Sequence, residues 1–286
     1  MKIIQILKTH DQGASFEFFP ARSEKGRKLL VNMIGILKQY KPLYASMTYG
    51  AGGGDQNRTK EAVSLLLETK ELEVMPHLTC LGARCNAIKD ILDEYKAKGI
   101  ENIMALRGDP PEGVTGFDFT QKDFSYAVDL VKTIKDYGHF CIGVAVYPEG
   151  HVEAVSLEQD LEHTKQKIDA GADFAVTQMF FDNKHYYSLV DRMHKNGIDI
   201  PVLPGILPLT DVEKVKQFAS ICRATIPKRI EKKMQCCIGQ PQEMEKIGID
   251  FTIEQCRQLI KNGIKRLHFF TLNKPQIITR ILDAIK

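Results

Sequence analysis

Short apolar runs recur along the chain, and longer segments with apolar residues three or four positions apart lie between them. The short runs are rich in Val, Ile and aromatic residues, which fit a pleated and buried surface, so we expect strands there. The expected strands are Ser15–Phe19, Tyr44–Tyr49, Glu73–Leu78, Asn102–Leu106, Cys141–Tyr147, Phe174–Gln178, Val202–Ile206 and Leu267–Phe270.

The longer segments predict helices. Between residues 90 and 98, for example, Ile91, Leu92 and Tyr95 have the spacing of one buried helix face. The clearest segments are Ala87–Lys98, Phe124–Tyr137, Leu157–Ala170 and Thr210–Ala219. Glycine often follows a helical segment here, at the position where a left-handed cap favours it. These glycines are Gly99, Gly138, Gly171 and Gly197.

The alternation amounts to about eight βα units, which favours a (β/α)8 TIM-type barrel over a doubly wound sheet. We expect one domain spanning residues 1–286, with ample surface to bury a core. The segment Lys228–Asp250 breaks the rhythm and is expected to be an excursion before the last βα unit.

Two loops that follow expected strands contain glycine. Gly50–Gly54 lacks both the dinucleotide-binding fingerprint and the Gly-Lys-Ser/Thr of a P-loop, so it is interpreted as a mobile active-site loop. Arg107–Pro111 follows the fourth expected strand, and its two prolines predict a rigid loop that fixes its charged residues.

Charge and composition exclude several classes of protein. Lys and Arg number 39 against 36 Asp and Glu, too even a balance to indicate nucleic acid as a partner. No apolar run approaches membrane-spanning length and no signal peptide opens the chain, so we expect a cytoplasmic protein with no membrane partner. The seven cysteines form no Cys-x-x-Cys pair, which predicts reduced thiols and no metal site.

Glu17 lies within the aromatic segment Ala14–Pro20. Side chains alternate along a strand, so Phe16 and Phe18 share one face and Glu17 points to the other. An unpaired carboxylate in such a strand costs several kcal/mol or takes up a proton. We therefore interpret Glu17 as a carboxyl group whose pKa is raised by burial for proton transfer, with a structural ion pair as the alternative.

Polar residues gather where the expected strands end, which is where barrels of this kind carry their chemistry. Each alone has an ordinary explanation, such as a structural histidine, but a set spread over most strands predicts a polar pocket at the mouth of the barrel. The set comprises Glu17, Thr48, His77, Arg107, Asp109, Tyr147, His151, Gln178 and Asn273.

The segments that carry these residues resemble those of the methylenetetrahydrofolate reductase family. They occur in order from about residue 14 to 280, and together they are specific. The segments are residues 15–20 (SFEFFP), 48–51 (TYGA), 76–80 (PHLTC), 105–109 (ALRGD), 147–151 (YPEGH), 177–182 (TQMFFD), 204–208 (PGILP) and 270–273 (FTLN). The chain ends at Lys286 with no room for a regulatory domain, so it resembles the compact bacterial form.

The resemblance implies FAD as the cofactor and NADH or NADPH as the hydride donor. The implied reaction reduces 5,10-methylenetetrahydrofolate to 5-methyltetrahydrofolate by alternate binding at one flavin face, and feeds methionine synthesis and one-carbon metabolism. It also implies a homo-oligomer.

The resemblance also implies a role for individual residues. Glu17 is expected to be the general acid that opens the methylene bridge, and the charge of Asp109 is expected to stabilise the resulting iminium cation. The other implied substrate contacts are Gln178, Phe218, Phe270 and Lys274.

The implied contacts to FAD lie along the second to sixth expected strands and the helix that follows the fifth. They are Thr48, His77, Arg107, Gly108, Asp109, Tyr147, His151, Asp160, His163 and Lys167. Asp160, His163 and Lys167 are three and four positions apart, so they share one helix face. His163 replaces an asparagine and Gln166 an arginine that are common in the family, and Lys274 stands at an arginine-like position. The resemblance therefore does not decide which contacts His163 and Gln166 make to the cofactor, or Lys274 to the folate tail.

Two alternatives remain from the sequence. One is another pterin-using barrel that transfers carbon without redox chemistry, and the other is a catalytically silent module that binds folate or flavin. The implied flavin contacts count against the first. The joint presence of Glu17, Asp109 and Gln178 counts against the second.

Overall fold

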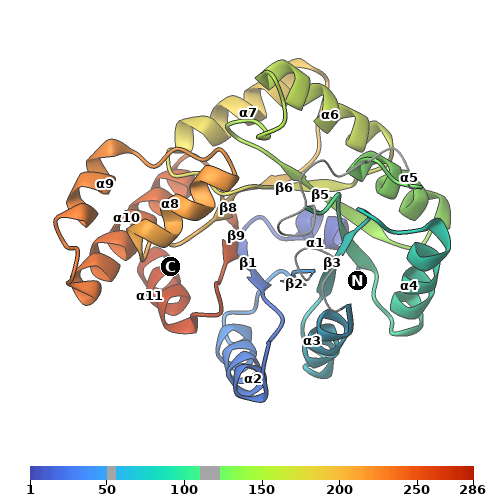
Figure 1. Ribbon diagram of the computed structural model, residues 1–286, viewed down its shortest axis with the longest axis horizontal. Helices are drawn as coiled ribbons and strands as arrows, with labels where there is room; N and C mark the ends of the chain where they lie inside the picture. Colours follow the sequence, from blue (N-terminus) through green and yellow to red (C-terminus); the bar gives the residue numbers. More distant parts are fainter. Residues whose placement is uncertain (50–55, 110–122) are drawn as a thin grey trace.

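A computed structural model of the chain describes residues 1–49, 56–109 and 123–286. The expected mobile loop Gly50–Gly54 lies outside these ranges, as do Pro110 and Pro111 of the expected rigid loop. The described residues form a ring of strands surrounded by helices (Figure 1).

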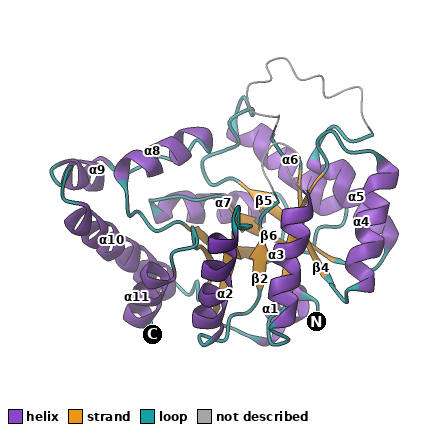
Figure 2. Cartoon of the chain, turned by 60° about the horizontal axis from the view of Figure 1, so that its bottom comes forward, coloured by secondary structure: helices purple, strands orange, loops and turns teal. Residues whose placement is uncertain are grey.

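All strand pairs in the described residues are parallel and belong to one sheet, in the order β7-β6-β5-β4-β3-β2-β1-β9-β8. The strands are β1 Gly13–Phe18, β2 Ala45–Met47, β3 Val74–Thr79, β4 Asn102–Leu106, β5 Cys141–Val146, β6 Phe174–Thr177, β7 Val202–Leu203, β8 Gly205–Ile206 and β9 Arg266–Phe270. In Figure 2 they occupy the centre of the molecule.

Pro204 divides one strand position into two. β7 ends before it and pairs with β6, whereas β8 begins after it and pairs with β9. Proline has no N–H to donate to a sheet, which explains why the expected strand Val202–Ile206 is interrupted. Counted as one position, β7 and β8 bring the ring to eight, so the predicted (β/α)8 barrel is confirmed.

Helices follow the strands on the outside of the ring, apart from α1. They are α1 Ile3–Thr9, α2 Glu24–Lys38, α3 Gln56–Glu68, α4 Cys85–Ala97, α5 Ala127–Tyr137, α6 Leu157–Asp169, α7 Asn183–Lys195, α8 Val212–Ile221, α9 Lys228–Gln235, α10 Pro241–Lys261 and α11 Pro275–Ile285. The segment Lys228–Asp250 contains α9 and the first half of α10. No helix within the described ranges has the length and apolar character to cross a membrane.

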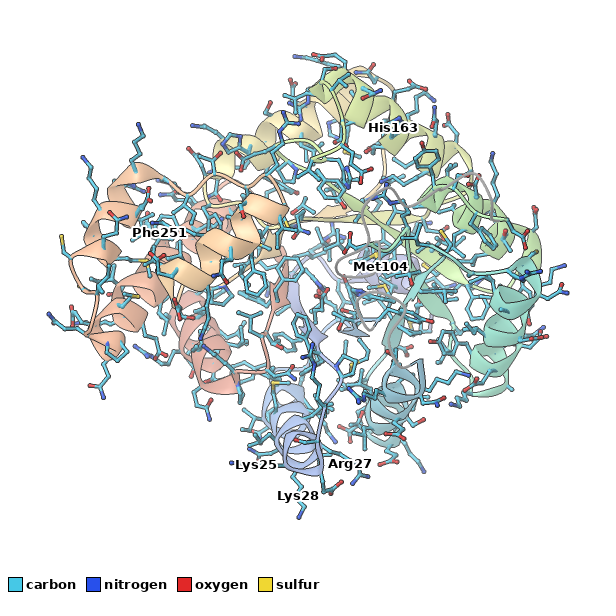
Figure 3. All side chains as sticks on the ribbon, viewed as in Figure 1. Lys25, Arg27, Lys28, Met104, His163 and Phe251 are labelled. Atoms are coloured by element: carbon cyan, nitrogen blue, oxygen red, sulfur yellow. The ribbon has the colours of Figure 1, made fainter. Side chains whose placement is uncertain are left out.

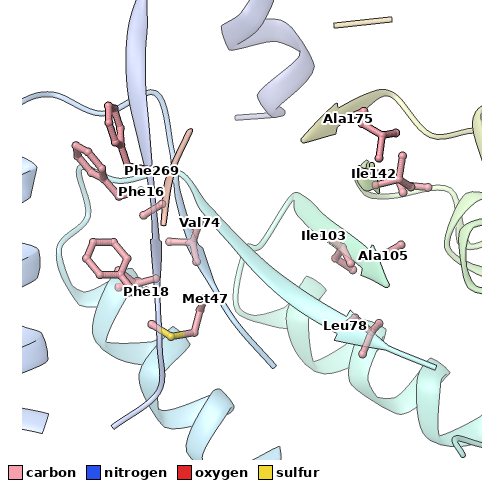
Figure 4. Packing of buried hydrophobic residues seen from close by; sticks show 14 of the residues in the cluster. Phe16, Phe18, Met47, Val74, Leu78, Ile103, Ala105, Ile142, Ala175 and Phe269 are labelled. Carbon is pink, nitrogen blue, oxygen red and sulfur yellow. The ribbon is translucent and has the colours of Figure 1, made fainter. Parts of the chain in front are cut away.

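The main hydrophobic core lies between the ring of strands and the outer helices. Phe16 and Phe18 point into it from β1, and Phe269 reaches it from the neighbouring strand (Figure 4). The alternation expected around Glu17 is therefore confirmed, because the residues on both sides of Glu17 face outward.

A second core fills the inside of the ring at the amino ends of the strands. Helix α1 inserts Ile3, Ile6 and Leu7 among inward-facing residues of the strands, such as Met75 and Phe174. The Asn102 carboxamide, at the start of β4, accepts a hydrogen bond from the backbone N–H of Ile3 at 2.7 Å. The sequence pattern did not predict this helix, which closes the floor of the barrel.

Helix α10 packs directly against the backbone that follows β8. A Cβ atom built on Gly248 would overlap the carbonyl oxygen of Leu209, and Thr252 one turn later accepts a hydrogen bond from the Leu209 N–H at 3.4 Å. In contrast, a Cβ atom on Gly35 in α2 would meet nothing within 4 Å.

We expect Gly248→Ala to lower the free energy of unfolding by about 2–4 kcal/mol, because the helix must move away from Leu209. Gly35→Ala is the matched control and should raise it by about 0.5–1 kcal/mol, since alanine favours a helix interior. Urea unfolding of both variants measures the difference. Equal effects of the two substitutions would show that the close packing at Leu209 contributes nothing.

Candidate active site

A cavity of about 430 Å³ opens inside the ring, above the core that α1 fills. Met104, near the centre of the ring in Figure 3, belongs to both the floor core and the cavity wall. The structure brings together here most of the residues expected from the sequence. They are Glu17, Thr48, His77, Arg107, Gly108, Asp109, Tyr147, His151, Gln178, Phe218 and Phe270.

A second cavity of about 360 Å³ lies beside the first, towards α6. Arg107, Tyr147 and His151 line both cavities, so the two lie side by side, and together they are called the elongated depression. The second cavity also holds the expected set on α6, of which His163 is labelled in Figure 3. This set comprises Asp160, His163 and Lys167, and Gln166 lines the same cavity.

Lys274 lies apart from these residues. It is exposed at the amino end of α11, and its side chain lines neither cavity.

Glu17 projects into the inner end of the main cavity, with only 10% of its side chain exposed. Its Oε2 atom lies 3.4 Å from Nε2 of His77 and 3.6 Å from Nε2 of His268. Both imidazole nitrogens are buried and have no closer hydrogen-bond partner among the described residues. One carboxylate thus lies between two imidazoles from the strands β3 and β9.

These neighbours change the expected electrostatics of Glu17. Burial raises the pKa of Glu17, but the charge of His77 and the hydrogen bond and charge of His268 outweigh burial, so the pKa lies below its ordinary value. The expectation of a raised pKa is therefore wrong. Burial also lowers the pKa of His77, whereas the negative charge of Glu17 opposes that shift.

His268 is held by contacts that the sequence analysis missed. Its Nδ1 atom lies 2.8 Å from the Ser15 hydroxyl and 3.3 Å from the Tyr44 hydroxyl, and the Tyr44 ring stacks on the imidazole at 5.6 Å between centroids. Strand alternation could have identified His268. It lies two positions before Phe270 on the same strand, so both side chains point to the same face, and Phe270 was expected in the site.

Cationic groups lie at the other end of the depression. Arg107 forms a two-pronged ion pair with Glu153, at 2.5 and 2.7 Å. The Lys167 ammonium donates a hydrogen bond to the Ala145 carbonyl at 2.6 Å, and desolvation lowers its pKa to about 8. A lysine whose charge is disfavoured in this way is suited to an anionic ligand.

A sequence profile of the family described as methylenetetrahydrofolate reductase matches residues 2–286. The chain belongs to that family. A 5,10-methylenetetrahydrofolate reductase of Pectobacterium carotovorum is 38% identical over 272 residues, which cover 95% of this chain and 89% of the relative. An Arabidopsis thaliana protein described as methylenetetrahydrofolate reductase (NADH) 1 is 35% identical over 99% of this chain, but only 50% of its own length is covered. The resemblance of the sequence motifs is confirmed.

A solved structure shares the fold at much lower identity. It is an uncharacterized protein from Clostridium thermocellum, described as binding two copies of 5-methyl-5,6,7,8-tetrahydrofolic acid. The TM-score is 0.67 at 13% identity, with 98% of this chain and 96% of the other covered. At that identity the likeness shows a common barrel fold.

Proposed function

We propose that this protein reduces methylenetetrahydrofolate as a flavoprotein, in which FAD occupies the elongated depression and reduced nicotinamide and folate bind in turn at one flavin face. The observation that carries the proposal is that the two adjacent cavities share Arg107, Tyr147 and His151 in their walls. A dinucleotide is long and has anionic and aromatic parts, so it requires a site of this shape.

The residues present fit FAD. Arg107 and Lys167 supply cations where a diphosphate would lie, and the cavity beside α6 supplies His163 and Asp160 for an adenosine. When bound, FAD would accept hydride from a nicotinamide and donate it to methylenetetrahydrofolate. Glu153 would have to share Arg107 with the diphosphate, because it already accepts two hydrogen bonds from that guanidinium.

In the proposed reaction Glu17 protonates a nitrogen of the methylene bridge, so that the bridge opens to an iminium cation. The ionised carboxylate must first take up a proton. Ligands that fill the main cavity would exclude water from Glu17 and so strengthen the effect of burial, which raises its pKa. His77 and His268, which lie 3.4 and 3.6 Å away, would hold the carboxyl group towards the ligand.

The other residues of the main cavity are assigned to substrate binding. Asp109 is exposed on the cavity wall, where its charge would stabilise the iminium cation. The Gln178 amide can donate to and accept from a pterin, and the rings of Phe218 and Phe270 would pack on flat ligands. Lys274 would act only as a point charge on a folate tail that extends beyond the cavity.

The first test is the visible absorption spectrum of the purified protein. We expect a yellow protein whose flavin band is bleached by NADH or NADPH under anaerobic conditions without folate. A protein that contains no flavin, and takes none up from added FAD, would remove this mechanism.

Glu17→Gln separates proton delivery from hydride transfer. The variant is nearly isosteric, so FAD should bind and reduced nicotinamide should still reduce it. Reoxidation by methylenetetrahydrofolate should slow at least a hundredfold, because a general acid contributes about 10²–10⁴-fold. Stopped-flow absorbance measures the two half-reactions separately. Reoxidation at the wild-type rate would make Glu17 a structural carboxylate.

Asp109→Asn tests the assigned electrostatic role. The substitution keeps the shape of the side chain but removes its charge, and only the folate half-reaction develops a cation beside it. We expect reoxidation by folate to slow about tenfold or more while reduction by nicotinamide changes little. If both half-reactions slowed equally in stopped-flow measurements, the flavin site as a whole would be disturbed.

A further inference from the structure

The contact between β1 and β9 continues beyond the regular strand pairing. The ladder ends at the pair Glu17–Phe270. One residue further, the backbone N–H and the hydroxyl of Thr271 both donate to the Glu17 carbonyl oxygen, at 3.2 and 2.6 Å. Thr271 is 2% exposed, so water does not compete for these hydrogen bonds.

The Asn273 side chain forms two further hydrogen bonds to the chain at Phe19, two residues after Glu17. Its Oδ1 atom accepts a hydrogen bond from the Phe19 N–H at 3.0 Å, and its Nδ2 atom donates to the Phe19 carbonyl at 3.0 Å. The carboxamide thus reproduces the exchange of two hydrogen bonds that a paired strand residue makes. Only a side chain with an acceptor and a donor on one flat group can do this.

The turn that presents Asn273 has an uncommon backbone conformation. Leu272 and Asn273 have φ angles of 47° and 54°, a region that asparagine tolerates and leucine rarely adopts. Hydrogen bonds from the Asn273 N–H to the Thr271 hydroxyl at 3.2 Å, and from the Lys274 N–H to the Thr271 carbonyl at 2.9 Å, hold the turn. Such a conformation persists where the surrounding contacts determine it, and these places are often functional.

We propose that Asn273 is a positioning residue for Glu17, an inference that rests on the proposed function. Thr271 binds the Glu17 carbonyl and Asn273 binds the backbone of Phe19. Hydrogen bonds therefore hold the backbone at Glu17 and two residues after it, and they restrict the tilt of the end of β1. The side chain of Glu17 therefore keeps its direction towards His77, His268 and the reacting nitrogen of the folate. Asn273 itself lines neither cavity and acts through the strand.

Asn273→Gly tests this role, because glycine keeps the left-handed backbone but removes both hydrogen bonds to Phe19. We expect reoxidation at saturating methylenetetrahydrofolate to slow at least tenfold. The folate concentration for half-maximal rate and the rate of reduction by nicotinamide should change less than threefold. Asn273→Asp should slow reoxidation in the same way, since its second oxygen would face the Phe19 carbonyl and could not donate to it. This variant tests the positioning role if the glycine variant does not fold.

Asn262→Gly is the matched control. Asn262 donates a hydrogen bond to the Gln258 carbonyl at 2.7 Å at the end of α10, outside both cavities, and its loss should leave both half-reactions unchanged. Equal slowing of both half-reactions in the Asn273 variants, or no slowing, would overturn the positioning role. A wild-type protein without flavin-dependent turnover would instead remove the proposed function.

Discussion

Side chains on a strand alternate between two faces, and a closed parallel sheet turns one of these faces into an interior with two different ends. Strand β4 shows how this constraint organises the molecule. Asn102 points inward at the amino end and binds α1, Met104 lies at the boundary, and Leu106 lines the cavity. Arg107, directly after the strand, reaches the rim of the cavity. The strand thus runs from the floor of the barrel to its mouth, and the polar residues of the candidate site lie at the mouth.

The cationic groups of the elongated depression lie together at its α6 end, where Glu153 and Asp160 accompany them. Glu17 lies at the inner end between two imidazoles, whereas Arg107 and Lys167 lie towards α6. This arrangement suits a ligand whose anionic part lies near α6, away from the proton transfer proposed at Glu17. The pKa of Glu17 lies below its ordinary value because the two histidines outweigh burial, so in the proposed mechanism the bound substrates would have to favour its protonated form.

Much of this arrangement could be predicted from sequence, because it depends on local pattern. Asn102–Leu106 was predicted with the observed bounds of β4, and the strand positions of Glu17 and His77 indicated the mouth of the barrel. The rest depends on contacts between distant segments. The pKa direction of Glu17 follows from His77 and His268, and no local rule places these two beside it. Helix α1 was not predicted, because seven residues without a side-chain cap carry little signal of their own.

The floor of the barrel has a consequence for how the chain folds. The Arg266 guanidinium, at the start of β9, donates a hydrogen bond to the Leu7 carbonyl in α1, and β9 pairs with β1. More than 250 residues separate these partners, so forming the contacts carries a large loop-closure entropy. During synthesis on the ribosome, α1 emerges early, yet the residues that pack on its apolar face extend along the chain as far as Leu203, and its contact with Arg266 forms later still. Packing of the helix that closes the barrel floor is thus completed late, and a chain stopped before residue 174 would leave Ile3, Ile6 and Leu7 without Phe174 and Leu203 and so accessible to chaperones.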